Sequence, residues 1–474
     1  MSQWLPLETL ASKVQAGQLK ASDLVRQSLK TIAEKSDYQA IIVCLDERAK
    51  QRAKAIDIDA AAKKPIGRLA GVPFIAKDNI LVYGAESTAA SNILRGFTAP
   101  YQATAIERLE AEGAICVAKA NLDAFAHGAS TENSDFFTTK NPHDKNRVPG
   151  GSSGGPAAAV VLEMAPFALG TDTGGSIRLP ASYCGCVGYK PTYGLVSRSG
   201  VVAMASSTDV VGPLTNSVVD AALVMDIIAG RDELDGTTIN RDKISYTNLS
   251  ANLKNTKIGI VKELMGKGLA IGVKDQIEQA MQKLREAGAS LIEVSLPSLP
   301  LSLAVYYIVA PAEISSNLAR YDGQRYGYSY PEAKNLNESY SKSRAIGFGK
   351  EAKRRIMIGT YVLSTGYYDA YYKKAQTVRT KLIKEFNEVF QQVDILISPV
   401  APSTAFKIGE NTADPLKMYL VDVMTVGPSL VGIPAVSLPC GQVDNLPVGL
   451  QLMAPQSQDR KLLGLAKSIE GLVI

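Results

Sequence analysis

Three short segments of this 474-residue chain carry side chains whose types and spacing could support acyl transfer. They are 71–77 (GVPFIAK), 150–155 (GGSSGG) and 172–178 (DTGGSIR). The chain holds only two histidines, His127 and His143. Because a serine nucleophile needs a base, and a neutral lysine is a known alternative to histidine, the three segments predict a serine hydrolase with a lysine base.

Lys77 is the candidate base. It can accept a proton only if its pKa falls from about 10.4 toward 7, which burial behind an apolar run such as 72–76 would favour. A lone lysine after an apolar strand more often marks the point where a strand reaches solvent. The lysine alone therefore leaves both interpretations open.

The two glycine-rich segments supply the nucleophile and its surroundings. We predict that Ser176 attacks the substrate and that Ser152 passes the proton toward Lys77. The backbone amides of Thr173, Gly174, Gly175 and Ser176 are the candidate oxyanion hole. Asp172 and Arg178 are expected to brace this loop.

Other chemistries have weaker support in the sequence. Neither G-x-x-x-x-G-K-[ST] nor G-x-G-x-x-G occurs, so a nucleotide site is not predicted. His127 and His143 lack the clustered Cys, Asp or Glu that a zinc site requires, and we interpret both as loop histidines. A Ser-His-Asp hydrolase is not supported either, because no G-x-S-x-G elbow precedes a helix with a histidine far downstream. The sequence predicts no bound metal or cofactor.

Composition is that of an ordinary globular protein, with 46% hydrophobic and 20% charged residues and a net charge of +5. The five cysteines are odd in number and scattered, which favours a reducing compartment such as the cytoplasm. Residues 1–7 lack the basic start and apolar core of a secretory signal, and no uninterrupted apolar run of roughly 18 residues predicts a membrane span.

The stretch 342–384 is locally basic and rich in tyrosine. It contains eleven Lys or Arg residues against Glu351 and Asp369. A solvated helix face, with lysine stems lying over aromatic rings, is the commoner explanation of such a pattern. A docking surface for an acidic partner is the alternative.

The hydrophobic pattern predicts the elements that position these residues. Helices alternate with short apolar strands, which is typical of an α/β protein with a largely parallel sheet. Ser22 is placed to cap the second helix. The polar stretch 236–257 is a candidate exposed insertion. The predicted helices span 7–35, 47–64, 103–113, 157–162 and 273–287, and the predicted strands span 41–45, 115–118, 258–261 and 290–294.

Together the three segments resemble the amidase signature family, with Ser152 75 positions after Lys77 and Ser176 24 positions after Ser152. The resemblance implies a Ser-Ser-Lys relay with Ser152 in a cis peptide. It also implies one domain over 1–474, built on a large mixed, largely parallel twisted sheet covered by helices on both faces. The helices in 7–64 would pack on that domain.

Within the family the chain is similar to the glutamine-hydrolysing A subunits of tRNA-dependent amidotransferases. The similarity implies that Tyr306, Arg355 and Asp422 recognise glutamine. A planar arginine suits the α-carboxylate of the free amino acid, and an aspartate suits its α-ammonium group. The segments that carry this similarity are 71–79, 121–133, 190–199, 310–323 and 347–379.

That similarity implies a glutaminase in a C–N ligase complex, which releases ammonia for transamidation of Glu-tRNA(Gln), Asp-tRNA(Asn) or both. Subunits B and C would be its partners, and the tRNA would bind mainly through the partner. ATP and Mg²⁺ would be used by the partner, which ammonia would reach through an interior channel. A stand-alone amidase acting on small amides and a catalytically silent scaffold are the alternatives.

Four positions depart from the family pattern. Pro156, Ala124, His127 and Leu179 stand where serine, glutamate, methionine and glutamine are common. Pro156 and Leu179 lie beside the predicted active loops, so they could alter substrate fit or contact with the partner.

Overall fold

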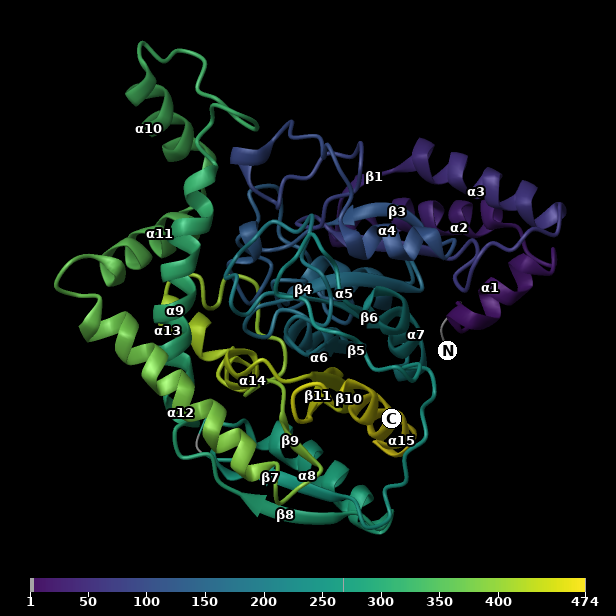
Figure 1. Ribbon diagram of the computed structural model, residues 1–474, viewed down its shortest axis with the longest axis vertical. Coiled ribbons are helices and arrows are strands. Elements are labelled where there is room, and N and C mark those ends of the chain that lie inside the picture. The colour runs from purple at the N-terminus through teal and green to yellow at the C-terminus, as the bar shows by residue number, and fades with distance from the viewer. Residues whose placement is uncertain (1–3, 267, 474) are drawn as a thin grey trace.

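Eleven strands form one mixed sheet in the computed structural model, which describes residues 4–266 and 268–473 (Figure 1). Their spatial order is β1-β3-β2-β4-β6-β5-β10-β11-β9-β7-β8. The strands are Ile41–Cys44 (β1), Pro73–Lys77 (β2), Ile115–Ala120 (β3), Phe167–Asp172 (β4), Val187–Lys190 (β5), Val210–Thr215 (β6), Lys257–Val261 (β7), Ser290–Val294 (β8), Ile395–Pro399 (β9), Ala435–Val443 (β10) and Leu446–Met453 (β11).

Helices connect and cover the strands. In chain order they are Leu7–Gln15 (α1), Ala21–Glu34 (α2), Asp46–Ala61 (α3), Thr104–Ala111 (α4), Gly154–Val161 (α5), Arg178–Cys184 (α6), Val218–Ile228 (α7), Ile271–Glu286 (α8), Ser302–Asn317 (α9), Leu336–Gly347 (α10), Lys350–Leu363 (α11), Lys374–Val389 (α12), Pro415–Leu420 (α13), Val426–Val431 (α14) and Asp459–Val473 (α15). The helices and strands expected between 7 and 120 and between 257 and 294 are all present, with ends shifted by a few residues.

The sheet is mixed, as expected, but the expectation that it is largely parallel is corrected. β2 runs parallel to β3 and β4, and β7 runs parallel to β8 and β9. The other six neighbouring pairs are antiparallel. β10 and β11 are joined through Asp444 and Asn445, both with positive φ, in a tight turn that only antiparallel neighbours permit. An alternation of strands and helices in sequence does not report strand direction.

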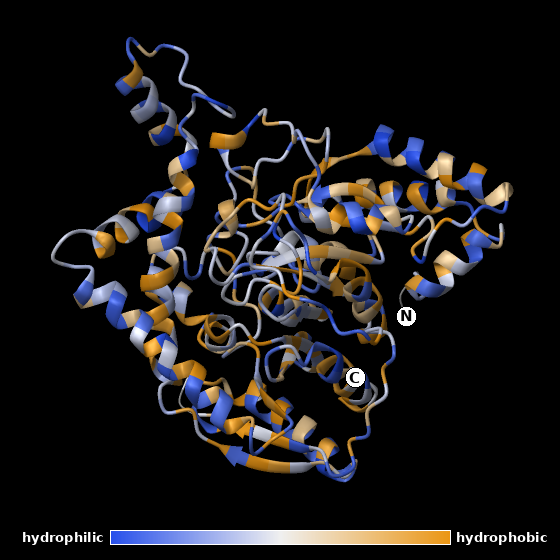
Figure 2. Ribbon diagram, viewed as in Figure 1, coloured by the Kyte–Doolittle hydropathy of each residue, from blue (hydrophilic) through white to orange (hydrophobic). Residues whose placement is uncertain are grey.

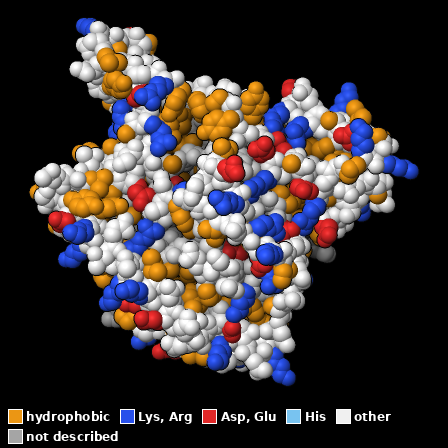
Figure 3. Space-filling view, in the orientation of Figure 1, with side chains coloured by type: hydrophobic (Ala, Val, Ile, Leu, Met, Phe, Trp, Pro, Cys, Tyr) orange, Lys and Arg blue, Asp and Glu red, His pale blue; other side chains and the backbone are white. Residues whose placement is uncertain are grey.

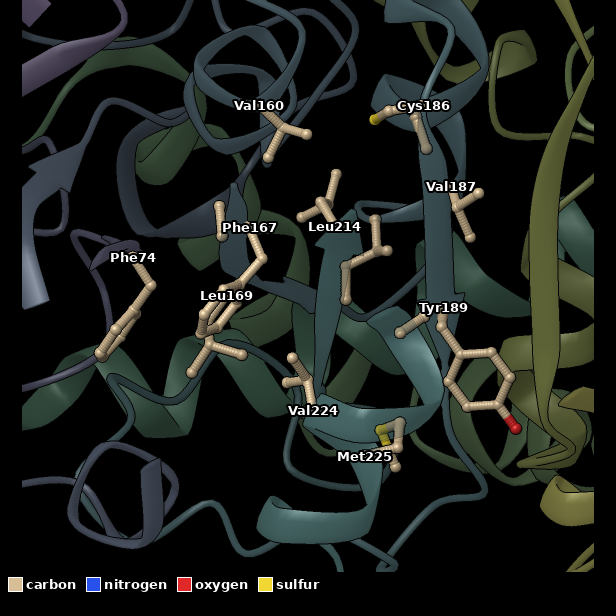
Figure 4. Packing of buried hydrophobic residues seen from close by; sticks show 14 of the residues in the cluster. Phe74, Val160, Phe167, Leu169, Cys186, Val187, Tyr189, Leu214, Val224 and Met225 are labelled. Carbon is tan, nitrogen blue, oxygen red and sulfur yellow. The ribbon is translucent and has the colours of Figure 1, made fainter. Parts of the chain in front are cut away.

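Helices cover both faces of the sheet, as expected. α5 and α6 contact each other and pack on central strands, whereas α7 and α8 both contact α15 and form a second group against the sheet. Figure 4 shows part of the resulting core, in which side chains of β4, β6 and neighbouring helices interdigitate. The rings of Phe74 and Phe167 stack there with centroids 5.2 Å apart. Figure 2 shows hydrophilic residues on the outward surfaces of α1–α3.

A second hydrophobic cluster lies where α9 packs against α11, α12 and α14. By length and composition Leu299–Arg320, which includes α9, is the one stretch in the described residues that could cross a membrane. Half of its most apolar window is buried against neighbouring elements. Packing within the fold therefore accounts for the apolar composition of α9, which also carries Tyr306.

The start of α2 differs from the prediction. Ser22 is not its cap, because the helix begins at Ala21 and no side chain of its own caps it. Instead, Asp57 of α3 accepts hydrogen bonds from the backbone amides of Ala21 (2.7 Å) and Ser22 (3.2 Å). A carboxylate from a packed neighbouring helix thus satisfies the orphan amides that a local serine was expected to satisfy.

Residues 236–257 form the loop that leads from α7 toward β7, and only Lys257 of this stretch belongs to a strand. Most of its side chains are exposed or half-buried, although Tyr246 and Leu253 are buried and tie the loop to the body. The loop connects the part of the sheet that carries the three motif segments to β7 and β8.

Candidate active site

Lys77 is the last residue of β2, and its side chain is fully buried. Its Nζ atom lies 2.7 Å from Ser152 Oγ and 2.9 Å from both Ser153 Oγ and Thr171 Oγ1. The peptide bond between Gly151 and Ser152 is cis, as the family resemblance implied. The strand end and the glycine-rich loop therefore place the predicted base in contact with the predicted relay serine.

Burial sets the protonation state of this lysine. Loss of solvent lowers the pKa of Lys77 to about 7, although the carboxylates of Asp123, Asp172 and Asp209 raise it. Three hydroxyl groups surround the amine, so it keeps hydrogen-bond partners without carrying a charge. Near neutral pH a substantial fraction of Lys77 is therefore unprotonated and able to accept a proton.

Ser176 lies in the loop between β4 and α6, and 7% of its surface is exposed. The two serine loops are joined where the backbone amide of Ser153 donates to the carbonyl of Ser176 (3.0 Å). Within residues 4–266 and 268–473 no hydrogen bond joins the Ser152 and Ser176 hydroxyls directly. The structure thus brings the loops together and leaves the Ser176 hydroxyl unengaged.

The loop before Ser176 presents free backbone donors. The amides of Gly174, Gly175 and Ser176 donate no hydrogen bond within the part of the chain that the structure describes. A Cβ atom at Gly174 would lie 2.7 Å from the Tyr306 hydroxyl, and one at Gly175 would lie 2.2 Å from Thr425 Oγ1. Only glycine fits at these two positions, and the close approach sets Tyr306 directly beside the nucleophile loop.

Asp172 and Arg178 brace this loop, as predicted. Arg178 donates to both carboxylate oxygens of Asp172 at 3.0 Å, and both side chains are fully buried. Asp172 also accepts the backbone amide of Ile177 (3.1 Å). The bidentate ion pair between Arg178 and Asp172, together with the hydrogen bond from Ile177, fixes the turn that carries Ser176.

The three expected glutamine contacts lie in one buried region. Tyr306 comes from α9, Arg355 from α11 and Asp422 from the segment before α14. Their exposed fractions are only 3%, 2% and 8%. An adjoining pocket, with a volume of about 60 Å³, is lined by Arg355, Tyr307 and residues of the loop 128–133. The rings of Tyr306 and Tyr307 lie 5.1 Å apart, centroid to centroid, and Tyr307 contacts both Arg355 and Asp422, so the three groups lie around one tyrosine.

Neighbouring side chains contact Arg355 and Asp422 and affect the pKa of Asp422. The guanidinium of Arg355 lies over the rings of Tyr307 and Tyr419, 5.3 and 5.7 Å from their centroids. Tyr307 donates to Asp422 (3.2 Å). Burial raises the pKa of Asp422 to about 7, although Arg355 and the Tyr307 hydroxyl lower it. Asp422 therefore titrates near neutrality.

The sequence did not single out Ser153, Thr171, Tyr307, Glu351 or Tyr419. Ser153 and Tyr307 adjoin predicted residues, and Glu351 lies one helical turn before Arg355, which is the only local signal any of them gives. Thr171 lies on β4, five residues before Ser176, and no motif marks its contact with Lys77. These contacts depend on strand pairing and helix packing.

Neither histidine joins the Lys77 site. His143 Nε2 lies 2.8 Å from the carbonyl oxygen of Cys184. His127 is fully buried, its two ring nitrogens have no hydrogen-bond partner among the described residues, and burial together with Arg355 lowers its pKa well below the usual value. In residues 4–266 and 268–473 no group of three or more His, Cys, Asp or Glu side chains could hold a metal ion.

The family is decided by comparison with known proteins. A protein-family model described as amidase matches residues 23–463. The chain belongs to the amidase signature family. The A subunit of the glutamyl-tRNA(Gln) amidotransferase of Caldanaerobacter subterraneus is 48% identical over 468 residues, which cover 98% of this chain and 96% of that protein. The same subunit of a Synechococcus is 50% identical over 452 residues, covering 95% of this chain and 88% of the relative.

Solved amidase structures agree with this assignment. The crystal structure of the glutamyl-tRNA(Gln) amidotransferase A subunit from Thermotoga maritima matches with a TM-score of 0.78 and 42% identity, over 95% of this chain and 91% of that one. A peptide amidase from Stenotrophomonas maltophilia matches with a TM-score of 0.82 and 28% identity, over 99% and 97%. The Ser-Ser-Lys segments of this chain thus lie on the fold that its relatives share.

The structure shows the setting of two departures from the family pattern. Pro156 lies in the first turn of α5, where a backbone amide has no partner within the helix and proline is tolerated. Leu179 is fully buried in a small hydrophobic cluster with Tyr183 and Val148. Both substitutions fit the local packing.

Proposed function

We propose that this chain is the glutamine-hydrolysing subunit of a tRNA-dependent amidotransferase. Support comes from the names of relatives about half identical over nearly the whole chain, and from one geometric observation. A buried lysine with a pKa of about 7 contacts Ser152 beside a loop that presents Ser176 and free backbone amides. That arrangement suits the cleavage of an amide bond.

The reaction proceeds in two halves. Ser176 Oγ attacks the side-chain amide carbon of glutamine, and its proton passes through Ser152 to Lys77 while the amides of Gly174, Gly175 and Ser176 stabilise the oxyanion. Thr173 is assigned to the same hole. The C–N bond breaks, Lys77 returns the proton through Ser152, and ammonia leaves. Water then hydrolyses the glutamyl ester, releases glutamate and restores Ser176.

Arg355 and Asp422 explain why the substrate is a free amino acid. A buried guanidinium binds the α-carboxylate, a buried carboxylate pairs with the α-ammonium group, and Tyr306 lies between them and the Gly174 loop. A stand-alone amidase acting on simple amides has no use for a buried pair of opposite charges near its nucleophile loop. The pair also argues against a silent scaffold, because unused buried charges cost stability.

We assign the ammonia route to two cavities that share no lining residue with the pocket beside Arg355. A small cavity behind Lys77 is lined by Asn79, Thr171, Thr173 and Asp209. A surface cavity with a volume of about 240 Å³ shares Asp209 and Arg198 with it. Thr173 donates to Asp209 (2.7 Å) at the inner end. We assign these cavities to the start of an ammonia channel that leads to a partner subunit.

The partner completes the overall reaction. We propose a cytoplasmic hetero-oligomer with subunits B and C, in which the partner binds the mischarged tRNA and uses ATP and Mg²⁺. The ammonia converts Glu-tRNA(Gln), Asp-tRNA(Asn) or both to the amide form. No nucleotide or metal role is assigned to this chain.

One assay tests the proposal. Glutamate release from glutamine is measured with the purified chain, alone and with its partner subunits, beside Ser176→Ala. We expect turnover by the wild type and a loss of several orders of magnitude in the variant. Turnover of aliphatic amides without glutamine would support the stand-alone amidase, and unchanged activity of Ser176→Ala would refute the assigned nucleophile.

A further inference from the structure

Asp123 is a fully buried carboxylate that neither the relay nor the glutamine contacts use. Its two oxygens accept separate backbone hydrogen bonds, one from Thr131 (2.9 Å) and one from Asn133 (3.1 Å). A Cβ atom added at Gly151 would lie 2.1 Å from Asp123 Oδ2. The carboxylate thus lies directly against the residue that precedes the relay serine.

Thr131 connects this carboxylate to the loop that carries Ser152. Its hydroxyl donates to the carbonyl of Gly150 (2.8 Å) and accepts the backbone amide of Gly154 (3.2 Å), so it spans the loop on both sides of Ser152. Thr131 has a φ of +64°, a conformation that β-branched residues rarely adopt. The Asp123 hydrogen bond and the double use of the hydroxyl explain why threonine is held there.

Asn133 connects the same carboxylate to the substrate side. It lines the pocket beside Arg355, and its side-chain amide donates to the carbonyl of His127 (3.0 Å). One carboxylate therefore ties the wall of the glutamine pocket to the loop of the relay serine.

Asp123 lies against Gly151, and the next residue, Ser152, contacts the Lys77 amine at 2.7 Å, so the carboxylate lies near enough to act on Lys77 through its charge. Among the carboxylates that raise the pKa of Lys77, Asp123 has the largest effect, followed by Asp172 and Asp209. Asp172 is paired with Arg178, and Asp209 accepts a hydrogen bond from Thr173. Glu132 and Lys77 are the charged groups that influence Asp123 itself.

We propose that Asp123 is a positioning residue with two roles: it fixes the Ser152 loop through Thr131, and its negative charge stabilises Lys77 while the lysine holds the proton taken from Ser176. This inference rests on the proposed relay and adds a group to it. Burial raises the pKa of Asp123 to about 6, against the amides of Thr131 and Asn133, so the carboxylate is charged at the pH where Lys77 is a base.

The test uses Asp123→Asn in the full chain with its partner subunits, with a thermal melt to verify folding. We expect kcat at pH 8 to fall about tenfold or more, because a charge-assisted contact is lost. We also expect the acid limb of kcat to move to lower pH by about 0.5 to 1 unit, because removing a negative charge disfavours protonated Lys77. An unmoved limb overturns the charge role, since loss of structure alone would not shift it.

Thr131 tests the loop role separately. Thr131→Val should lower kcat without moving the limb, and Thr131→Ser, which keeps the hydroxyl, should restore most of the activity. Wild-type kcat in Thr131→Val overturns this role. If the wild type itself released no glutamate, the proposed function would fail. The pH dependence of Ser176 labelling by a fluorophosphonate would then test Asp123 by the same shift, without glutamine.

Discussion

Arg355 donates through Nε to Glu351 Oε1 (2.8 Å), which lies one turn earlier on α11. No hydrogen bond of the two Nη atoms exists within the described residues, so the outer edge of the guanidinium is free. Desolvation alone would lower the pKa of Arg355, but Tyr307 and Glu351 raise it above the ordinary arginine value. Glu351 thus orients a permanently charged fork toward the pocket, ready for a bidentate carboxylate.

Arg355→Ala should lower kcat/KM for glutamine by about 30-fold or more, which corresponds to roughly 2 kcal/mol for a lost charged contact. Arg355→Lys keeps the charge but not the fork, and we expect it to recover only part of the loss. Kinetics with glutamine and with a primary amide lacking the α-carboxylate provide the measurement. An equal loss of kcat/KM on both substrates would mean that Arg355 does not recognise the α-carboxylate.

Titration of Asp422 should make glutamine binding depend on pH. Its pKa is about 7, and only the carboxylate form pairs with the α-ammonium group. KM should therefore be lowest above pH 7 and rise as the pH falls through 7. Asp422→Asn should have a high KM that no longer changes over this range. Tyr307→Phe removes a hydrogen bond that lowers this pKa, so the rise in KM should begin at a higher pH. A flat wild-type KM between pH 6 and 8 would contradict the assignment.

Titration of Lys77 should produce a separate acid limb in the pH profile of kcat. The pKa of about 7 means that the neutral base is present above pH 7 and is lost as the pH falls through 7, so kcat should fall on the acid side. Lys77→Arg stays protonated at every working pH and should be inactive, as should Lys77→Met. Rates at saturating glutamine separate this limb from the change in KM. Appreciable activity of Lys77→Arg would show that the amine is not the base.

Thr171→Val removes one of the hydroxyl groups that surround Lys77. Its Oγ1 lies 2.9 Å from Nζ and also accepts a hydrogen bond from Asn79 (3.1 Å). We expect kcat to fall about fivefold to tenfold with KM unchanged, since one buried hydrogen bond is worth about 1 kcal/mol. Thr171→Ser is the matched control and should stay near the wild type. A change confined to KM would show that Thr171 contacts substrate rather than the base.

The residues of the proposed relay could be found in the sequence because each lies inside a local pattern. Lys77 ends an apolar run, and glycines that leave room for backbone donors flank Ser152 and Ser176. Tyr306, Arg355 and Asp422 are spread over more than a hundred positions of the sequence. Only the family resemblance predicted that they act together. The structure gathers them because α9, α11 and the segment before α14 pack around one cluster.

Contacts that depend on packing between elements gave no comparable signal. Asp57 caps a helix 36 positions away, and Thr171 reaches Lys77 only because β2 and β4 are neighbours in the sheet. The prediction of a largely parallel sheet was wrong for a related reason. Strand direction depends on how the strands are connected and paired, and hydrophobic periodicity does not report it. Residues inside local motifs can therefore be predicted from the sequence, whereas the contacts between elements that support them cannot.

The basic, tyrosine-rich stretch can be tested at the end that joins α11 and α12. Tyr361, Tyr367 and Tyr371 are exposed there and lie against one another, with Tyr361 and Tyr367 centroids 4.3 Å apart. Figure 3 shows hydrophobic side chains gathered on this projecting end. None of these tyrosines lines the pocket beside Arg355. Exposed aromatic rings are enriched at protein interfaces, and the neighbouring lysines add the positive charge that an acidic partner requires.

Reversing the charge of Lys373 and Lys374 to glutamate should weaken binding of the partner subunits or of tRNA while leaving glutamine turnover by the chain alone unchanged. Both lysines are exposed, and among the described residues Lys373 has one ion-pair partner, the exposed Asp369, so folding should be unaffected. Lys384→Glu, farther along α12, is the matched control. Binding is measured by titration at two salt concentrations, because a charge contribution weakens as salt rises. Unchanged binding with impaired glutamine turnover would instead assign this stretch to the glutamine pocket.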